Sequence, residues 1–180
     1  MKKTAYIIPF LLFISISSIY CQSTILNLYE TDEYKINFPG QPEKNTQTVQ
    51  SYLGELLMTI VSFELNEVAN DSNFVYMVIE SKYPDSTIHS NKKEMLDAFF
   101  RNAITGSLKS VDGKLLKEIS EIIGIYPSRT IEVDYQNGLA VLKMKMILRE
   151  SKLIIIQTIT STANYPNYSI DKFFNSFNLK

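Results

Sequence analysis

The residue types most used in nucleophilic catalysis and zinc binding are scarce, because the chain has one histidine and one cysteine. His89 lies in a polar segment before a predicted helix, as is typical of an exposed loop residue. A zinc site needs three or four ligands from Cys, His and carboxylates. A Ser-His-Asp triad on a hydrolase fold would show a GxSxG turn, and no such motif occurs. The sequence therefore predicts neither kind of site.

Two carboxylates could do acid–base chemistry. Glu132 and Asp134 are two residues apart on a predicted strand, so both point to one face. Glycosidases use such a pair of carboxyl groups. Lys143 and Lys145 lie on the neighbouring predicted strand, which favours a cross-strand charge ladder worth at most about 1 kcal/mol per pair. We prefer the ladder and keep a hydrolase as an alternative.

No phosphate-binding loop is present, because neither GxxxxGK[ST] nor GxGxxG occurs. Lys and Arg number 18 against 19 Asp and Glu, so the chain lacks the basic excess that nucleic-acid binding requires. We predict no cofactor and no nucleic-acid partner.

Several tyrosines lie near predicted turns and strand ends. The segment Tyr165-Pro166-Asn167-Tyr168 is the best candidate for contact with a partner, and Tyr126 is a second candidate. Tyrosine is enriched at protein interfaces. The alternative is that each ring packs at the end of a strand while its hydroxyl meets water.

The N-terminus has the features of an export signal. Lys2 and Lys3 precede an apolar run over residues 5–19, which is shorter than the roughly 20 residues of a membrane span. We expect cleavage after Cys21, because the bulky Tyr20 does not suit lipidation of Cys21. Residues 1–21 would then be a cleaved signal peptide, and residues 22–180 one exported domain without a transmembrane span, periplasmic or extracellular. A lipoprotein anchored through Cys21 is the alternative.

Alternating apolar residues and β-branched content predict strands along most of the mature chain. The strands are expected at residues 34–38, 56–65, 73–81, 130–135 and 139–149, with another after the Glu150-Ser151 turn. Residues 115–123 suit a strand or a short helix. Residues 41–45 and 66–72 are expected to be loops.

Two helices are predicted from apolar residues at helical spacing. The first runs for about four turns after a cap at Ser90 or Asn91, and the second covers residues 169–177 with Ser169 as its cap.

The clearest local signal is a hairpin at Asn137-Gly138. Its register places Ile131 opposite Met144 and Val133 opposite Leu142. A second turn at Glu150-Ser151 places Leu148 opposite Leu153. Since several strands are apolar on both sides, we predict an α+β domain whose antiparallel sheet is covered on both faces.

The segments YKINFPGQP, IYPSR and DKFFNSFNL, with the helix between them, resemble the PsbP-like superfamily of α/β/α sandwiches. This group includes the extrinsic PsbP subunit of photosystem II, a Ran-binding nuclear import factor and small exported bacterial proteins of unknown role. The resemblance covers residues 34–179. It implies a scaffold that docks to larger partners, usually without catalysis, and it transfers no specific partner.

The leading hypothesis is therefore a non-catalytic accessory module that binds a protein partner in the bacterial envelope. One alternative is the hydrolase with Glu132 and Asp134. Another is a carrier of a lipid or other apolar ligand, whose pocket would be lined by Phe99, Phe100, Ile104, Met144, Met146 and Ile155.

Overall fold

The computed structural model describes residues 27–51, 54–65 and 73–180. The predicted signal peptide, Cys21 and the predicted loop at 66–72 lie outside the described residues. Within the described ranges, no helix is long and apolar enough to cross a membrane.

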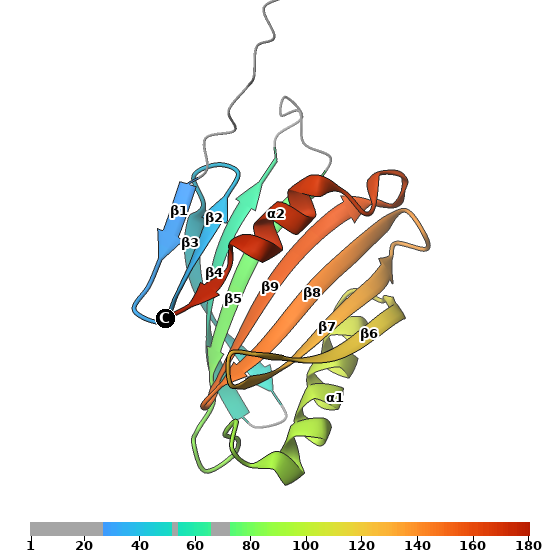
Figure 1. Ribbon diagram of the computed structural model, residues 1–180. Coiled ribbons are helices and arrows are strands. Elements are labelled where there is room, and N and C mark those ends of the chain that lie inside the picture. Colours follow the sequence, from blue (N-terminus) through green and yellow to red (C-terminus); the bar gives the residue numbers. More distant parts are fainter. Residues whose placement is uncertain (1–26, 52–53, 66–72) are drawn as a thin grey trace, which may run out of the picture.

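Antiparallel strands dominate the chain, and two helices accompany them (Figure 1). A seven-stranded sheet has the order β3-β4-β5-β9-β8-β7-β6, and a three-stranded sheet has the order β1-β2-β10. The strands are β1 (Asn27–Glu30), β2 (Tyr34–Phe38), β3 (Glu43–Ser51), β4 (Gly54–Glu64), β5 (Asn73–Lys82), β6 (Lys114–Ile123), β7 (Tyr126–Tyr135), β8 (Ala140–Arg149), β9 (Lys152–Ser161) and β10 (Asn178–Leu179). The helices are α1 (Lys93–Ser110), the 3-10 turn η1 (Thr162–Asn164) and α2 (Tyr168–Ser176).

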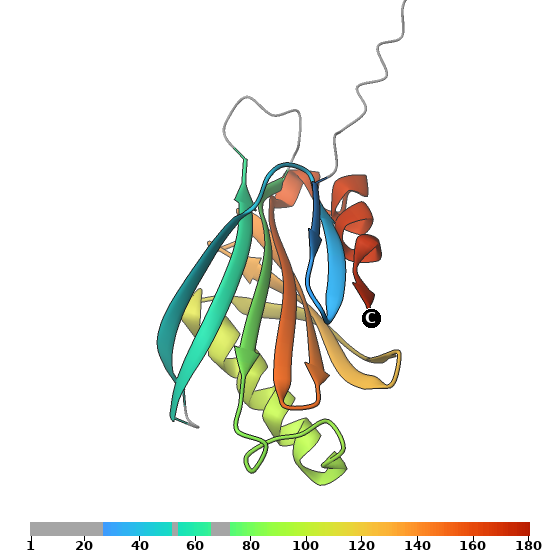
Figure 2. The same cartoon turned by 90° about the vertical axis from the view of Figure 1, so that its left-hand side faces the viewer.

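The large sheet carries a hydrophobic cluster on each face. On one face, Phe99, Phe100 and Ile104 of α1 pack against the sheet. On the other face, α2 contributes Ile170, Phe173 and Phe174, and β2 contributes Tyr34, Ile36 and Phe38. Figure 2 shows α1 on one side of the sheet, and the small sheet with α2 on the other. The α+β class with an antiparallel sheet was predicted, whereas the small sheet was not.

Both hairpins have the predicted register. Ile131 pairs with Met144, Val133 with Leu142, and Leu148 with Leu153. Gln136, Asn137 and Gly138 all have positive φ, of 57°, 54° and 86°. The last paired residues are Tyr135 and Ala140, so the loop has four residues, although the register is the one that a two-residue Asn-Gly turn predicts. The Asn137-Gly138 signal therefore predicts the pairing of β7 with β8, and the Glu150-Ser151 turn predicts the pairing of β8 with β9.

The prediction of a loop at residues 41–45 was wrong beyond its first two residues, because β3 begins at Glu43. This strand lies at the edge of the sheet and exposes nearly all its side chains. An exposed edge strand needs no apolar alternation, so the pattern used to find strands was missing. The open choice at residues 115–123 is settled, because β6 is a strand.

The predicted helix caps were wrong. Helix α1 starts after Lys92 without a side-chain cap, and the hydroxyl of Ser90 instead accepts a bond from the Glu150 amide at 3.2 Å. Helix α2 is capped by Asn167, whose side chain accepts from the Ile170 amide at 3.0 Å, two residues before the predicted Ser169. Ser90 does not cap α1 because it bonds to the turn between β8 and β9, whereas the cap of α2 is local and lies one residue before the helix.

Candidate functional site

The predicted contact segment forms a rigid corner between η1 and α2. We call Tyr165, Pro166, Asn167 and Tyr168 the tyrosine corner; the Tyr165-Pro166 peptide bond is cis. The corner is fastened to β5 through Asn73, whose side chain is only 1% exposed. The side-chain nitrogen Nδ2 of Asn73 donates to the Tyr76 hydroxyl at 2.6 Å and to the side-chain oxygen Oδ1 of Asn167 at 3.3 Å.

The side chain of Asn167 completes this attachment. Its nitrogen Nδ2 donates to the Asn73 side-chain oxygen at 3.0 Å and to the backbone carbonyl of Asn164 at 3.1 Å. Its side-chain oxygen also caps α2 through the Ile170 amide. Buried amide pairs of this kind hold a segment in one conformation, because breaking them leaves buried polar groups without partners.

The two tyrosines of the corner differ in exposure. Tyr165 is half-buried against the cluster under α2. Burial raises the pKa of the Tyr165 phenol, and a hydrogen bond with Glu132 raises it further. Tyr168 is the first residue of α2 and is 78% exposed, and Pro166 is also exposed. The corner thus has one anchored ring and one ring presented to solvent.

Apolar residues near the corner add to this surface. The backbone of Thr162 donates to the Leu139 carbonyl at 3.0 Å, and the Thr162 hydroxyl donates to the Gly138 carbonyl at 2.7 Å. These bonds hold η1 against the turn between β7 and β8, where Leu139 is exposed. Phe74, next to the anchoring Asn73, is exposed as well.

Tyr126, the second predicted contact residue, is not part of the corner. It starts β7 and pairs with Ile123, and the Arg149 guanidinium lies 5.7 Å from its ring centre. Glu132, which contacts Tyr165, is six residues further along β7, or roughly 20 Å at the usual strand rise. The structure therefore brings Tyr165, Pro166 and Tyr168 together and leaves Tyr126 at the far end of the strand.

The predicted carboxylate pair has internal partners. Glu132 lies opposite Lys143, as predicted, but its ion pair is with Lys117 of β6 at 3.8 Å. Asp134 accepts from the Gly138 amide at 2.6 Å and so stabilises the hairpin turn. Lys143 in turn pairs with Asp171 of α2 at 3.5 Å. These contacts support the interpretation as structural cross-strand charges. The ion pairs also reach β6 and α2, beyond the two strands of the hairpin.

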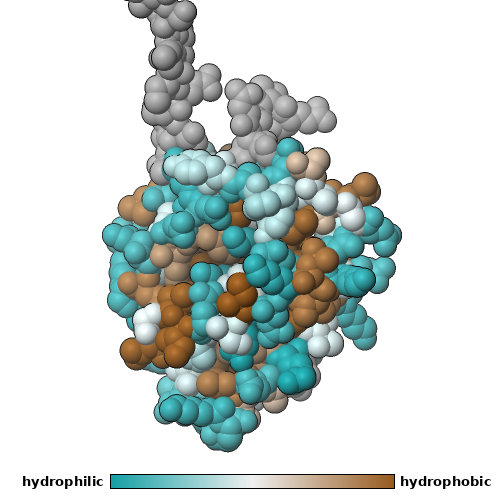
Figure 3. All heavy atoms as spheres, turned by 45° about the vertical axis from the view of Figure 1, so that its right-hand side comes forward, coloured by the Kyte–Doolittle hydropathy of each residue, from teal (hydrophilic) through white to brown (hydrophobic). Residues whose placement is uncertain are grey.

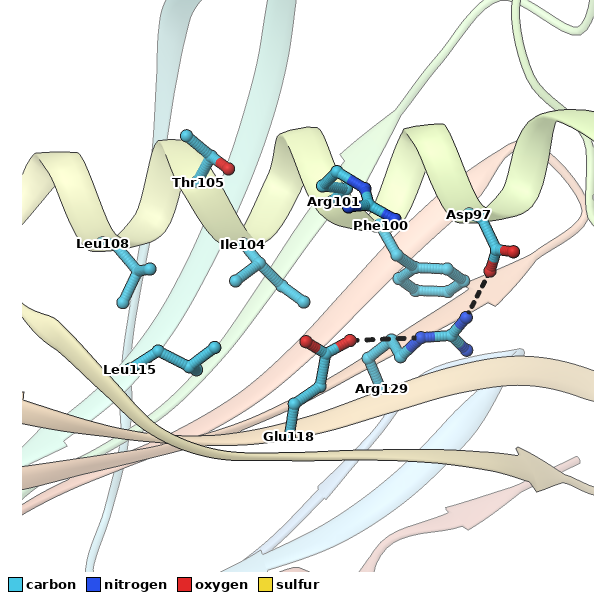
Figure 4. A pocket seen from close by; sticks show the side chains of 9 residues that line it. All are labelled: Asp97, Phe100, Arg101, Ile104, Thr105, Leu108, Leu115, Glu118 and Arg129. Atoms are coloured by element: carbon cyan, nitrogen blue, oxygen red, sulfur yellow. Dashed lines mark hydrogen bonds and ion pairs between the residues drawn. The ribbon is translucent and has the colours of Figure 1, made fainter.

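A groove of about 310 Å³ lies between α1 and strands β6 and β7 (Figure 4), and the sequence did not predict it. Arg129 occupies one end, 2.7 Å from Asp97 and 3.5 Å from Glu118, with its guanidinium 4.9 Å from the Phe100 ring centre. These residues come from three separate elements, so no local motif could have shown it. Asp97 and Glu118 both pair with Arg129, so this guanidinium is already engaged by carboxylates of the protein itself.

The residues expected to line a carrier pocket mostly fill the core. Phe99, Met144 and Met146 are buried in the cluster beneath α1. Phe100 and Ile104 are also buried, and their outer edges border the groove. Among the residues that the structure describes, no group of three or more His, Cys, Asp or Glu could hold a metal ion.

Comparison with known proteins identifies the fold. No family model matches the chain, and no curated protein matches its sequence. The structure is similar to the solution structure of cyanobacterial PsbP (CyanoP) from Synechocystis sp. PCC 6803, with a TM-score of 0.51 and 12% identity over 86% of this chain and 92% of that chain. A protein of unknown function from Pseudomonas aeruginosa, PA94, gives a TM-score of 0.40 with 19% identity, over 78% of this chain and 86% of that one. The fold is therefore PsbP-like, as the resemblance in the sequence predicted.

Proposed function

We propose that the chain is an exported, non-catalytic accessory module of the bacterial envelope, built as a PsbP-type α/β/α sandwich. It binds a protein partner through the tyrosine corner. The observation that carries this proposal is the exposed Tyr168 ring on a segment that partly buried hydrogen bonds between Asn73 and Asn167 hold in place.

Interface energetics favour such a feature. A few residues carry most of the binding energy of an interface, and tyrosine is among the most common of them. Binding costs less when the contact residues are already ordered. The Asn73–Asn167 pair fixes the backbone before Tyr168, so that ring can be presented without a large loss of conformational entropy.

The surroundings of the corner indicate the chemistry of the partner. Tyr168, Pro166 and Leu139 present apolar surface, and Asp171 near the start of α2 adds an exposed carboxylate. We propose a folded protein whose surface has an apolar pocket for the Tyr168 ring with hydrogen-bond donors at its rim. The non-catalytic part of the proposal is supported by the internal contacts of Glu132, Asp134 and Arg129.

Site-specific photocrosslinking in cells tests this function. A photoreactive residue replaces Tyr168 in one variant and Leu57 in a matched control, because Leu57 is 63% exposed at the opposite end of the sheet. We expect one discrete adduct from position 168, identified by mass spectrometry and reduced by an excess of unmodified chain. Equal adducts at both positions, or none at position 168, would contradict the proposal.

A further inference from the structure

Strand β6 leaves an apolar edge of the large sheet open. Within the part of the chain that the structure describes, β6 pairs only with β7. Ile119 is 43% exposed and Ile122 is 71% exposed, and Leu116 and Ile125 of the same region are exposed too. Figure 3 turns this side of the molecule forward and shows apolar residues interspersed with hydrophilic ones.

The opposite edge of the sheet is built differently. Strand β3 has the sequence EKNTQTVQS, which offers almost no apolar side chain. Exposed edge strands with apolar side chains tend to pair with another strand, and proteins usually protect them with polar residues. The difference between the two edges points to β6 as a place where a further strand pairs.

We propose that this strand is β6 of a second copy of the chain, paired antiparallel about a two-fold axis at Ile119. The sequence of β6 is complementary to itself in this register. Ile119 faces Ile119 of the second copy, and Lys117 faces Glu121 of the second copy on both sides of the axis. Further out, Leu116 and Ile122 approach each other at both ends.

Side-chain geometry selects this register. A two-fold axis normal to the sheet must pass at a residue, because only then do opposite side chains lie on the same face. An axis at Lys117, Glu118 or Glu121 would place like charges directly opposite each other, which is destabilising. An axis at Ser120 would place Ile119 opposite Glu121, and Glu118 opposite Ile122. Among the possible axes at residues 117–121, only the axis at Ile119 places an apolar residue opposite an apolar residue and a positive charge opposite a negative one.

The charges already present on this face fit the proposed pairing. Lys117 forms an ion pair with Glu132, and Glu121 forms one with Lys145 at 3.5 Å. Lys117 and Glu121 both remain partly exposed. Pairing would join these charges into a row of alternating sign across both copies. The β-bulge of β6 lies between Leu115 and Lys117, outside this central segment.

We expect a dimer that dissociates on dilution. Pairing along one edge buries less area than the standard interface of roughly 1,600 Å². The unpaired backbone groups and Ile119 supply the attraction, while Lys117 and Glu121 fix the register. This inference is independent of the tyrosine corner, and replacing Tyr168 should leave the dimer unchanged.

Charge reversal provides the test. Sedimentation velocity over a range of concentrations compares residues 22–180, which contain every described element, with Lys117→Glu and Glu121→Lys. We expect a concentration-dependent dimer for the unchanged chain and at least a tenfold larger dissociation constant for each variant, because each creates two like-charge pairs. Mixing the two variants should restore dimerisation, because opposite charges then face each other at both positions.

Lys44→Glu on the other edge is the matched control, and it should dimerise like the unchanged chain. Circular dichroism melts confirm that each variant is folded. Two misfolded variants would not pair when mixed. A restored heterodimer therefore shows that each variant alone lost the pairing and not the fold. A monomer at all concentrations, undiminished dimerisation of either variant, or failure of the mixture to pair would overturn the proposal.

Discussion

At the scale of single residues, the burial of Tyr34 makes the free energy of unfolding depend on pH. Its side chain is fully buried, and its hydroxyl donates to Glu80 at 2.6 Å. Burial raises the pKa of the Tyr34 phenol strongly, and the hydrogen bond and charge of Glu80 raise it further. A raised pKa in the folded state contributes stability below the unfolded pKa of about 10, and this stability is lost as the pH rises above that value.

The variant Tyr34→Phe tests this coupling. We expect its free energy of unfolding to be lower by about 1 kcal/mol at neutral pH, because the bond to Glu80 is lost. Above pH 10 the free energy of unfolding should fall less steeply with pH than in the unchanged chain. Urea titrations between pH 7 and pH 11 measure both effects, and parallel curves above pH 10 would contradict the assignment.

Asn167 both caps α2 and attaches the tyrosine corner to Asn73. We expect Asn167→Ala to lower the free energy of unfolding by about 1–3 kcal/mol. The substitution removes the cap of α2 and the hydrogen bonds between the side chains of Asn73 and Asn167. Asn178→Ala is the control, since Asn178 makes an exposed bond to the Ser176 carbonyl. Equal urea midpoints for the two variants would show that Asn167 does not anchor the corner.

Sequence reasoning at this scale succeeded where the determining groups were local. Asn137 and Gly138 impose their own backbone geometry, so the hairpin register could be derived from two residues. The cap predicted at Ser90 failed because Ser90 bonds to Glu150, sixty residues away in sequence, whereas the Asn167 cap of α2 is local and was simply missed. The Asn73–Asn167 pair likewise joins residues distant in the chain, so the rigidity of the corner could not be predicted.

At the scale of elements, the Pro39-Gly40 turn connects the small sheet to the large one. A Cβ atom at Gly40 would lie 2.2 Å from the ring of Phe63 on β4. This close approach gives the turn a structural role. The close approach explains why a residue without a side chain is needed where β2 leads into β3.

Gly40→Ala should therefore lower the free energy of unfolding by about 1–3 kcal/mol through overpacking. Gly106→Ala is a control of opposite sign, because Gly106 lies inside α1 with open space around its Cβ position. There we expect a gain of about 0.5–1 kcal/mol from helix propensity. Thermal melts measure both variants, and a stabilising Gly40→Ala would contradict the packing.

Elements with strong apolar alternation were predictable, and the polar or very short ones were not. Strands β4, β8 and β9 carry apolar residues that reach the clusters on both faces, and β5 contributes Tyr76 and Val78 to one of them. Strand β3 is polar, and β10 has only two residues, so neither has a periodic pattern. The three-stranded sheet depends on β2 pairing with β10, which lies about 140 residues later in the chain, so it is a long-range arrangement.

At the scale of the whole molecule, the proposed export would determine in which compartment a partner is met. If residues 1–21 are a cleaved signal, the mature protein should begin at Gln22. Intact-mass spectrometry of the protein from the cell envelope measures this end directly. A diacylglyceryl adduct on Cys21 would show instead that the chain is a lipoprotein.

The molecule presents its candidate binding features on two separate surfaces. The tyrosine corner lies at one end of the sheet beside α2, and the open edge of β6 lies at the side. A dimer through β6 would carry two corners, so a partner with two sites would be bound more tightly by avidity. Tyr165 and Tyr168 remain contacts predicted from the sequence, whereas the open edge of β6 emerged only from the strand order.

The most direct test of the binding role of the corner is the affinity of the chain for its partner, measured with the purified partner that the crosslink identifies. Calorimetric titration compares the unchanged chain with Tyr168→Ala and with the control Leu57→Ala. We expect the dissociation constant to rise at least tenfold for Tyr168→Ala, which corresponds to about 1.4 kcal/mol, and to stay within twofold for the control. Equal affinities for all three proteins would contradict the assignment of the tyrosine corner as the binding surface.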